Sequence, residues 1–98
     1  MRLELSGFVE GDLDTIAHFI PQVNPTRAIS FLREIRQQIL AVGKNPLPYH
    51  LRPEIGEGAR MAIVGRHGIL FRVSDRAVRI GRVVYGGRDL LALFLPEE

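Results

Sequence analysis

The chain has 98 residues, 46% of them apolar, and a formal net charge of +2. This length and composition predict one folded domain over residues 1–98, and the longest wholly apolar run, residues 90–95, is too short to span a bilayer. The chain has no cysteine, which excludes disulfides and thiolate metal sites and fits a cytoplasmic protein.

A short strand and a helix are predicted at the start of the chain. Leu3 and Leu5 alternate with polar residues, which is typical of a strand with one buried face. Apolar residues then recur at helical spacing, and Pro21 ends the helix that they predict: Val9, Leu13, Ile16, Ala17 and Ile20.

A second helix follows so closely that the two are expected to form a helical hairpin. Asn24 and Pro25 suit the N-cap and the first position of this helix. We expect Gly43 to cap its C-terminus and Pro46 to prevent its continuation. Its apolar stripe consists of Ala28, Phe31, Leu32, Ile35, Ile39 and Val42.

Residues 44–58 contain three prolines and two glycines, which indicates a loop. We expect this loop to pack against the rest of the domain, because four of its side chains are available as anchors. These are Leu47, Tyr49, Leu51 and Ile55.

From Ala59 onward the apolar period is two, which predicts three strands joined by turns at residues 65–68 and 74–76. We expect these strands to cover the stripe of the second helix with Ile63, Phe71, Val73 and Ile80. The order strand, helix, helix, three-stranded antiparallel meander predicts an α+β fold with helices on one face of a mostly antiparallel sheet. The apolar end of the chain is expected to form a short C-terminal helix, or else to be covered by a partner.

No metal or cofactor site is expected. His18, His50 and His67 lack metal-ligand spacing, and no Asp or Glu pattern completes a site. Ser-His-Asp sets, phosphate-binding glycine loops and paired-carboxylate motifs are absent from the sequence.

Arginine supplies twelve of the thirteen basic residues, and eight arginines lie in residues 50–98. Codon usage could explain this preference, but the distribution favours an acidic partner, either a protein or a nucleic acid. Arg82 shares strand parity with Val78, so on a buried face it needs a carboxylate or a cleft. Arg72 and Arg82 therefore either pair with residues such as Asp12 or Glu34, or form a basic site on the open face of the sheet.

Two segments together resemble the ParE branch of the RelE/ParE toxin superfamily. They are Arg-Pro-Glu-Ile-Gly-Glu-Gly at residues 52–58 and Gly-Arg-Asp-Leu at residues 87–90. The resemblance extends over residues 3–94 and implies the same order of elements as the periodicity does. It also implies a partner- or target-binding site that comprises Arg60, Arg72, Arg82, Arg88, Asp89 and Phe94.

The superfamily has two activities. RelE-type members cut messenger RNA in the ribosome with basic residues and a tyrosine, whereas ParE-type members poison DNA gyrase without a catalytic group. Laid on this chain, the RelE pattern retains Arg88, but its mid-sheet arginine falls near Gly68 and its tyrosine near Phe94. Phenylalanine cannot exchange a proton, so no enzymatic activity is expected. The chain departs from the ParE branch at Tyr85, where a histidine is common.

The resemblance thus implies a type II toxin that poisons DNA gyrase and forms a hetero-oligomer with a ParD-like antitoxin. No sequence-specific nucleic-acid binding is expected. Two alternatives stay open, namely a ribosome-dependent endoribonuclease and a non-toxic binding module that acts only with its antitoxin.

Overall fold

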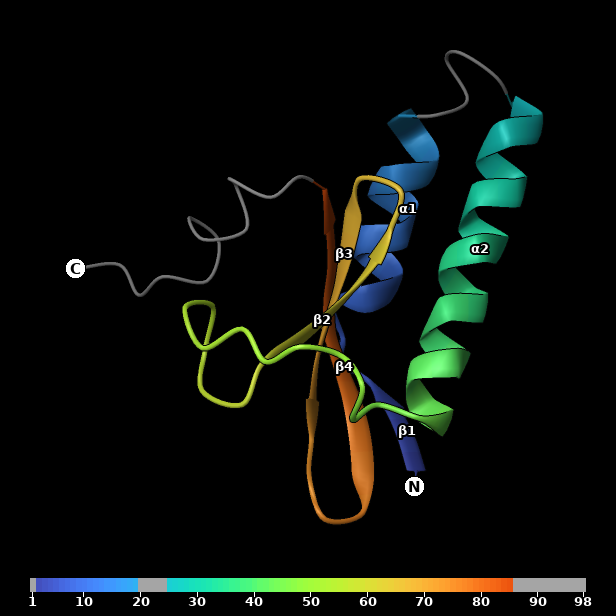
Figure 1. The fold of residues 1–98 in the computed structure, drawn as a ribbon. Coiled ribbons are helices and arrows are strands. Elements are labelled where there is room, and N and C mark those ends of the chain that lie inside the picture. The colour runs from blue at the N-terminus through green and yellow to red at the C-terminus, as the bar shows by residue number, and fades with distance from the viewer. Residues whose placement is uncertain (1, 20–24, 86–98) are drawn as a thin grey trace.

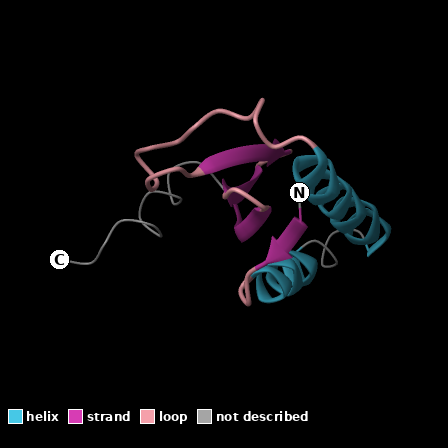
Figure 2. Ribbon diagram, turned by 90° about the horizontal axis from the view of Figure 1, so that it is seen from below, coloured by secondary structure: helices cyan, strands magenta, loops and turns pink. Residues whose placement is uncertain are grey.

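The computed structural model describes residues 2–19 and 25–85, which form a four-stranded sheet with two helices on one face (Figures 1 and 2). The predicted α+β fold is confirmed, while the expected C-terminal helix lies outside the described residues. Within the described part of the chain, no helix is long and apolar enough to cross a membrane. The elements are β1 (Arg2–Leu5), α1 (Val9–Phe19), α2 (Pro25–Lys44), β2 (Arg60–Val64), β3 (His67–Val73) and β4 (Ala77–Tyr85).

The strand order in the sheet is β1-β4-β3-β2. The three C-terminal strands form the predicted antiparallel meander, and β1 pairs in parallel with the first half of β4. Since β1 ends at Leu5, opposite Ile80, no strand of the described residues lies beside the rest of β4 on that side. Residues of α1 take this place, as described below.

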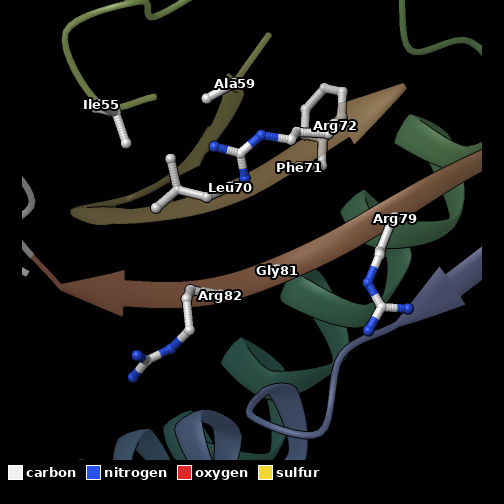
Figure 3. Close-up of a pocket in the computed structure, with 8 residues that line it drawn as sticks. All are labelled: Ile55, Ala59, Leu70, Phe71, Arg72, Arg79, Gly81 and Arg82. Atoms are coloured by element: carbon white, nitrogen blue, oxygen red, sulfur yellow. The ribbon is translucent and has the colours of Figure 1, made fainter. Parts of the chain in front are cut away.

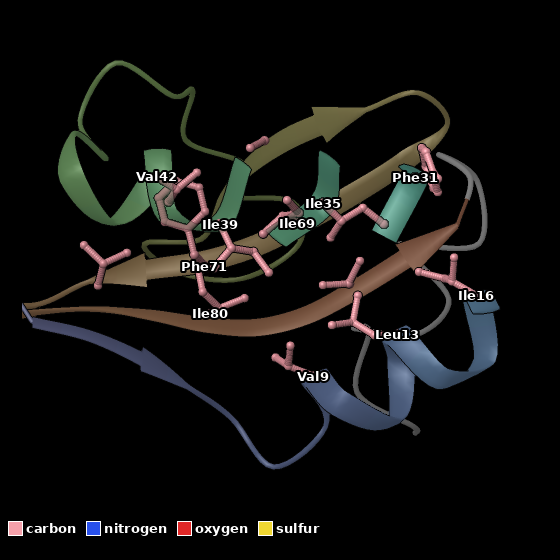
Figure 4. Packing of buried hydrophobic residues seen from close by; sticks show 13 residues of the cluster. Val9, Leu13, Ile16, Phe31, Ile35, Ile39, Val42, Ile69, Phe71 and Ile80 are labelled. Atoms are coloured by element: carbon pink, nitrogen blue, oxygen red, sulfur yellow. The ribbon is translucent and has the colours of Figure 1, made fainter. Parts of the chain in front are cut away.

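The main hydrophobic core lies between the helices and the sheet (Figure 4). The stripe of α2 meets Phe71 and Ile80, as predicted, and Val73 packs at the margin of this core. The prediction for Ile63 is wrong, because its side chain is 59% exposed while Ala62 is buried. Ala62 pairs with Ile69, and directly paired residues share a face, so the register turns Ala62 toward α2 and Ile63 away from it.

Gly43 does not cap α2, which continues to Lys44. A Cβ at Gly43 would come within 3.2 Å of the Leu3 side chain. The glycine is therefore explained by the close approach of β1 to the end of the helix, and the buried Pro46 follows where the helix stops.

The predicted alternation of side chains between the two faces of β4 is interrupted after Ile80. The register shifts between Leu70 and Phe71, which pair with Arg82 and Ile80, so Gly81 is an extra residue in a β-bulge. Beyond the bulge Val83 belongs to the helix-facing core, whereas Val84 packs on the opposite face. Arg82 consequently does not share a face with Ile80.

A second, smaller core lies on the face that the helices leave uncovered. There the loop before β2 places Ile55 and Ala59 over Leu70 and Val84, with Met61 beside them. The loop packs against the domain as predicted, with Tyr49 anchored on the main core. The other two expected anchors, Leu47 and Leu51, are mostly exposed.

Candidate functional site

Three arginines surround a pocket on the face of the sheet opposite the helices (Figure 3). Arg72 comes from β3, while Arg79 and Arg82 come from β4 on either side of Gly81. The pocket has a volume of about 100 Å³, and Ile55, Ala59, Leu70 and Phe71 complete its lining. We call this feature the arginine pocket. It joins a small apolar surface to positive charge, which suits an anionic group.

Arg72 is held over the loop before β2 by a hydrogen bond. Its Nε donates a hydrogen bond to the carbonyl oxygen of Glu57 at 3.0 Å. A Cβ at Gly56 would lie 2.3 Å from Nη2 of Arg72, so this guanidinium position requires glycine or a shifted side chain. Within the described residues Arg72 has no carboxylate partner, and its charge stays available.

Arg79 stands directly opposite Arg72 in the β3–β4 register. Like charges in this position destabilise a sheet. The side chain of Arg79 is 58% exposed and approaches Glu4 at 3.8 Å, near the limit for an ion pair. Glu4 also pairs with Arg2 at 3.0 Å, so one carboxylate serves two guanidinium groups. This corner of the sheet keeps an excess of positive charge.

Arg82 makes the ion pair with Asp12 that the sequence left as one of two possibilities. Its Nε and Nη2 donate hydrogen bonds to the two carboxylate oxygens at 2.9 and 2.8 Å. These bonds raise the pKa of Arg82 above its ordinary value. The guanidinium carbon also lies 4.9 Å from the centre of the Phe8 ring. Arg82 therefore links β4 to α1 and borders the pocket at the same time.

The guanidinium of Arg60 is bonded within the fold. Its Nη1 donates hydrogen bonds to the carbonyl oxygens of Tyr49 and Leu47 at 2.7 and 3.3 Å. These contacts tie the loop after α2 to the start of β2 and place Arg60 outside the arginine pocket. The remaining predicted site residues, Arg88, Asp89 and Phe94, lie outside the described residues.

Sequence reasoning missed Arg79 as a pocket residue. The turn predicted at residues 74–76 contained the necessary information, because a hairpin closing there pairs Val73 with Val78 and hence Arg72 with Arg79. Sequence reasoning also treated His67 only as a turn residue. In the structure His67 begins β3, and its ring lies 5.0 Å from that of Phe31 and 5.1 Å from that of Tyr85.

The environment of His67 is apolar. Its Nδ1 is buried and has no hydrogen-bond partner among the described residues. Burial lowers the pKa of this imidazole below its ordinary value of 6.5. Among the described residues, no group of three His, Cys, Asp or Glu side chains could hold a metal ion. We therefore read His67 as part of the packing between α2 and the sheet.

The chain matches the family model for the ParE toxin of type II toxin–antitoxin systems over residues 3–90. It belongs to this family and is thus a toxin component of a type II toxin–antitoxin system. No curated protein sequence gave a match.

Two solved structures share the fold. One is a chain of the chromosomal ParDE toxin–antitoxin system from P. aeruginosa, with 22% identity and a TM-score of 0.76, covering 89% of this chain and 97% of that one. The other is a chain of the RelBE2 toxin–antitoxin complex from Mycobacterium tuberculosis, with 21% identity and a TM-score of 0.60, covering 86% and 95%.

Proposed function

We propose that this ParE-family toxin poisons DNA gyrase in the cytoplasm and is neutralised by a ParD-like antitoxin. Membership of the family over residues 3–90 carries the proposal. The arginine pocket supports it, because an open basic face suits an acidic partner or enzyme-bound DNA.

The toxin is proposed to act without a catalytic group of its own. In the superfamily's ribonucleases, cations and a tyrosine handle the charge and the protons of the reaction. Here Arg60 stands on the corresponding strand, but its guanidinium is hydrogen-bonded to two loop carbonyls. Phe94 near the tyrosine position has no proton to exchange. Both features favour a binding mechanism over RNA cleavage.

The antitoxin is proposed to cover apolar as well as basic surface. Ile29 and Leu40 are 64% and 57% exposed, and their spacing places them along the same side of α2. Exposed apolar side chains of this kind are suited to an amphipathic partner helix. Both solved structures described above come from toxin–antitoxin systems, which also supports a hetero-oligomer.

Controlled induction of the chain in bacterial cells tests the proposed function. We expect a DNA-damage response and filamentation while bulk messenger RNA stays intact, and we expect Arg88→Ala to weaken both responses. Messenger cleavage without DNA damage would favour the ribonuclease. Normal growth at a verified level of folded protein would favour a non-toxic binding module.

A further inference from the structure

The arginine pocket contains a pair of like charges that lowers the stability of the sheet and that the fold does not require. Arg72 and Arg79 are direct cross-strand neighbours, and paired like charges lower the stability of a sheet. Figure 3 shows their guanidinium groups turned apart, Arg72 toward the loop before β2 and Arg79 toward β1. The hydrogen bond of Arg72 to the Glu57 carbonyl oxygen and the approach of Arg79 to Glu4 keep the two groups in these directions. An anion seated between the two side chains would remove the repulsion.

The floor of the pocket is open at Gly81. Among the described residues, a Cβ built there would meet only the Leu70 carbonyl oxygen, at 3.7 Å, which is an ordinary contact. The residue also has no positive φ that would demand glycine. Neither crowding nor backbone conformation thus explains the missing side chain, and the glycine keeps the space between Arg79 and Arg82 free.

Positive charge continues from the pocket toward the β3–β4 turn. Arg76 is exposed in that turn, and the backbone N–H of Arg2 is hydrogen-bonded to its carbonyl oxygen at 2.9 Å. Arg2, itself mostly exposed, thus lies beside the turn. This group of arginines, in which Glu4 pairs with Arg2 and Asp75 precedes Arg76 in the turn, is still larger than a single carboxylate or phosphate needs. Repeated anionic groups at regular spacing, as in a nucleic-acid backbone, match it better.

We propose that the arginine pocket binds a backbone phosphate of duplex DNA, with Arg72 and Arg79 closing on the phosphate over Gly81. A tetrahedral phosphate offers oxygens in several directions, so it can accept hydrogen bonds from guanidinium groups that approach from different sides. The flat carboxylate of an acidic peptide presents two oxygens in one plane and suits a single guanidinium fork better. Contacts confined to phosphates carry no sequence preference.

This inference deepens the proposed function, because a gyrase poison acts where enzyme and DNA meet, and its biological meaning rests on that function. DNA binding itself can be measured without gyrase. A phosphate contact would let the toxin engage the DNA segment held by its target, in addition to any contact with the enzyme surface.

The test uses the free 98-residue chain, made by cell-free synthesis, and a short fluorescent DNA duplex whose anisotropy is followed over a range of salt concentrations. Arg72→Gln and Arg79→Gln should each lower the salt slope of log K by about 1 and weaken binding roughly three- to tenfold at low salt. Both should leave the melting temperature nearly unchanged, since relief of the like-charge pair offsets the lost hydrogen bond of Arg72 to Glu57 and the lost long ion pair of Arg79 to Glu4.

Two further variants separate the pocket from general charge. Gly81→Val leaves the net charge unchanged but fills the pocket floor, and it should weaken binding to a similar extent. Arg33→Gln removes one exposed guanidinium from α2, in the helical layer outside the pocket, and should change affinity by less than about twofold. An equal loss in Arg33→Gln, or full binding by Gly81→Val, would contradict the proposed site.

Competitors identify the ligand. A duplex of different sequence should displace the probe equally well, and poly-glutamate at matched charge should displace it poorly. Efficient displacement by poly-glutamate would favour an acidic peptide, and tighter binding of single-stranded RNA would favour RNA; either result would overturn the inference. If the unmodified toxin binds DNA as expected but does not poison gyrase, that result would contradict the proposed function without contradicting the phosphate site.

Discussion

The carboxylate of Asp12 on α1 accepts two hydrogen bonds from the Arg82 guanidinium on β4 and a third from the Val83 backbone N–H at 2.9 Å. Because β1 stops opposite Ile80, no strand in the described part of the chain flanks this part of β4 on that side, and Asp12 satisfies the N–H that such a strand would have bonded. Two residues before Val83 on β4, the carbonyl oxygen of Gly81 accepts a hydrogen bond from the Ser6 hydroxyl. The first helix therefore completes the edge of the sheet at the point where the arginine pocket begins.

Arg82→Ala is expected to lower the free energy of unfolding by about 1–3 kcal/mol. The substitution leaves the Asp12 carboxylate, whose side chain is only 12% exposed, with a single hydrogen bond from the backbone. Urea denaturation followed by circular dichroism measures the change. Arg79→Ala is the matched control, since its long, exposed ion pair should contribute less than about 1 kcal/mol. Equal losses in both variants would show that the Arg82–Asp12 pair has no special role in stability.

Phe31→Ala should cost about 3–5 kcal/mol, because the residue is only 6% exposed and packs between α2 and the sheet, beside the β2–β3 turn. That is a large part of the total stability of a small domain. Ile29→Ala, on the same helix but 64% exposed, should shift the thermal midpoint by only a degree or two. A similarly small shift for Phe31→Ala would mean that the stripe of α2 does not pack as described.

The stability of the protein should fall as the pH drops below about 7, in part because of His67. Burial holds the pKa of this imidazole below 6.5, so between the two pKa values the unfolded chain binds a proton that the folded chain does not. The free energy of unfolding consequently rises with pH through this window and falls on acidification. His67→Phe should flatten that dependence and fit between the Phe31 and Tyr85 rings. Denaturation at about pH 7.5 and about pH 5.5 gives the free energy of unfolding of the unmodified protein and of His67→Phe. An equal loss of this free energy on acidification in both proteins would argue against a role for His67.

The cognate antitoxin should form a tight complex that protects both the helices and the sheet. We expect hydrogen exchange to slow along α2, where Ile29 and Leu40 are exposed, and along β3 and β4 near the arginine pocket. The comparison is between the free chain and the co-purified complex. Unchanged exchange over both regions would exclude this mode of neutralisation.

The order of the elements and the apolar stripe of α2 could be predicted from the sequence because each depends on local periodicity. The buried face of β2 could not be predicted, since its residues 61–64 are all apolar. Only the pairing of Ala62 with Ile69 decides which side of the strand is buried. The bulge at Gly81 could not be predicted either, because an apolar period of two assumes a strand without an extra residue. The pocket depends on that bulge and on a cross-strand pair, so it required the tertiary structure.

The most direct test of the central claim is a cleavage assay with purified DNA gyrase, supercoiled plasmid and the 98-residue chain. We predict that the toxin increases the amount of gyrase-linked cleaved DNA in a dose-dependent manner, that prior mixing with its antitoxin abolishes the effect, and that Arg88→Ala weakens it without unfolding the protein. An unchanged level of cleaved DNA, together with ribosome-dependent cleavage of messenger RNA by the same preparation, would contradict the account.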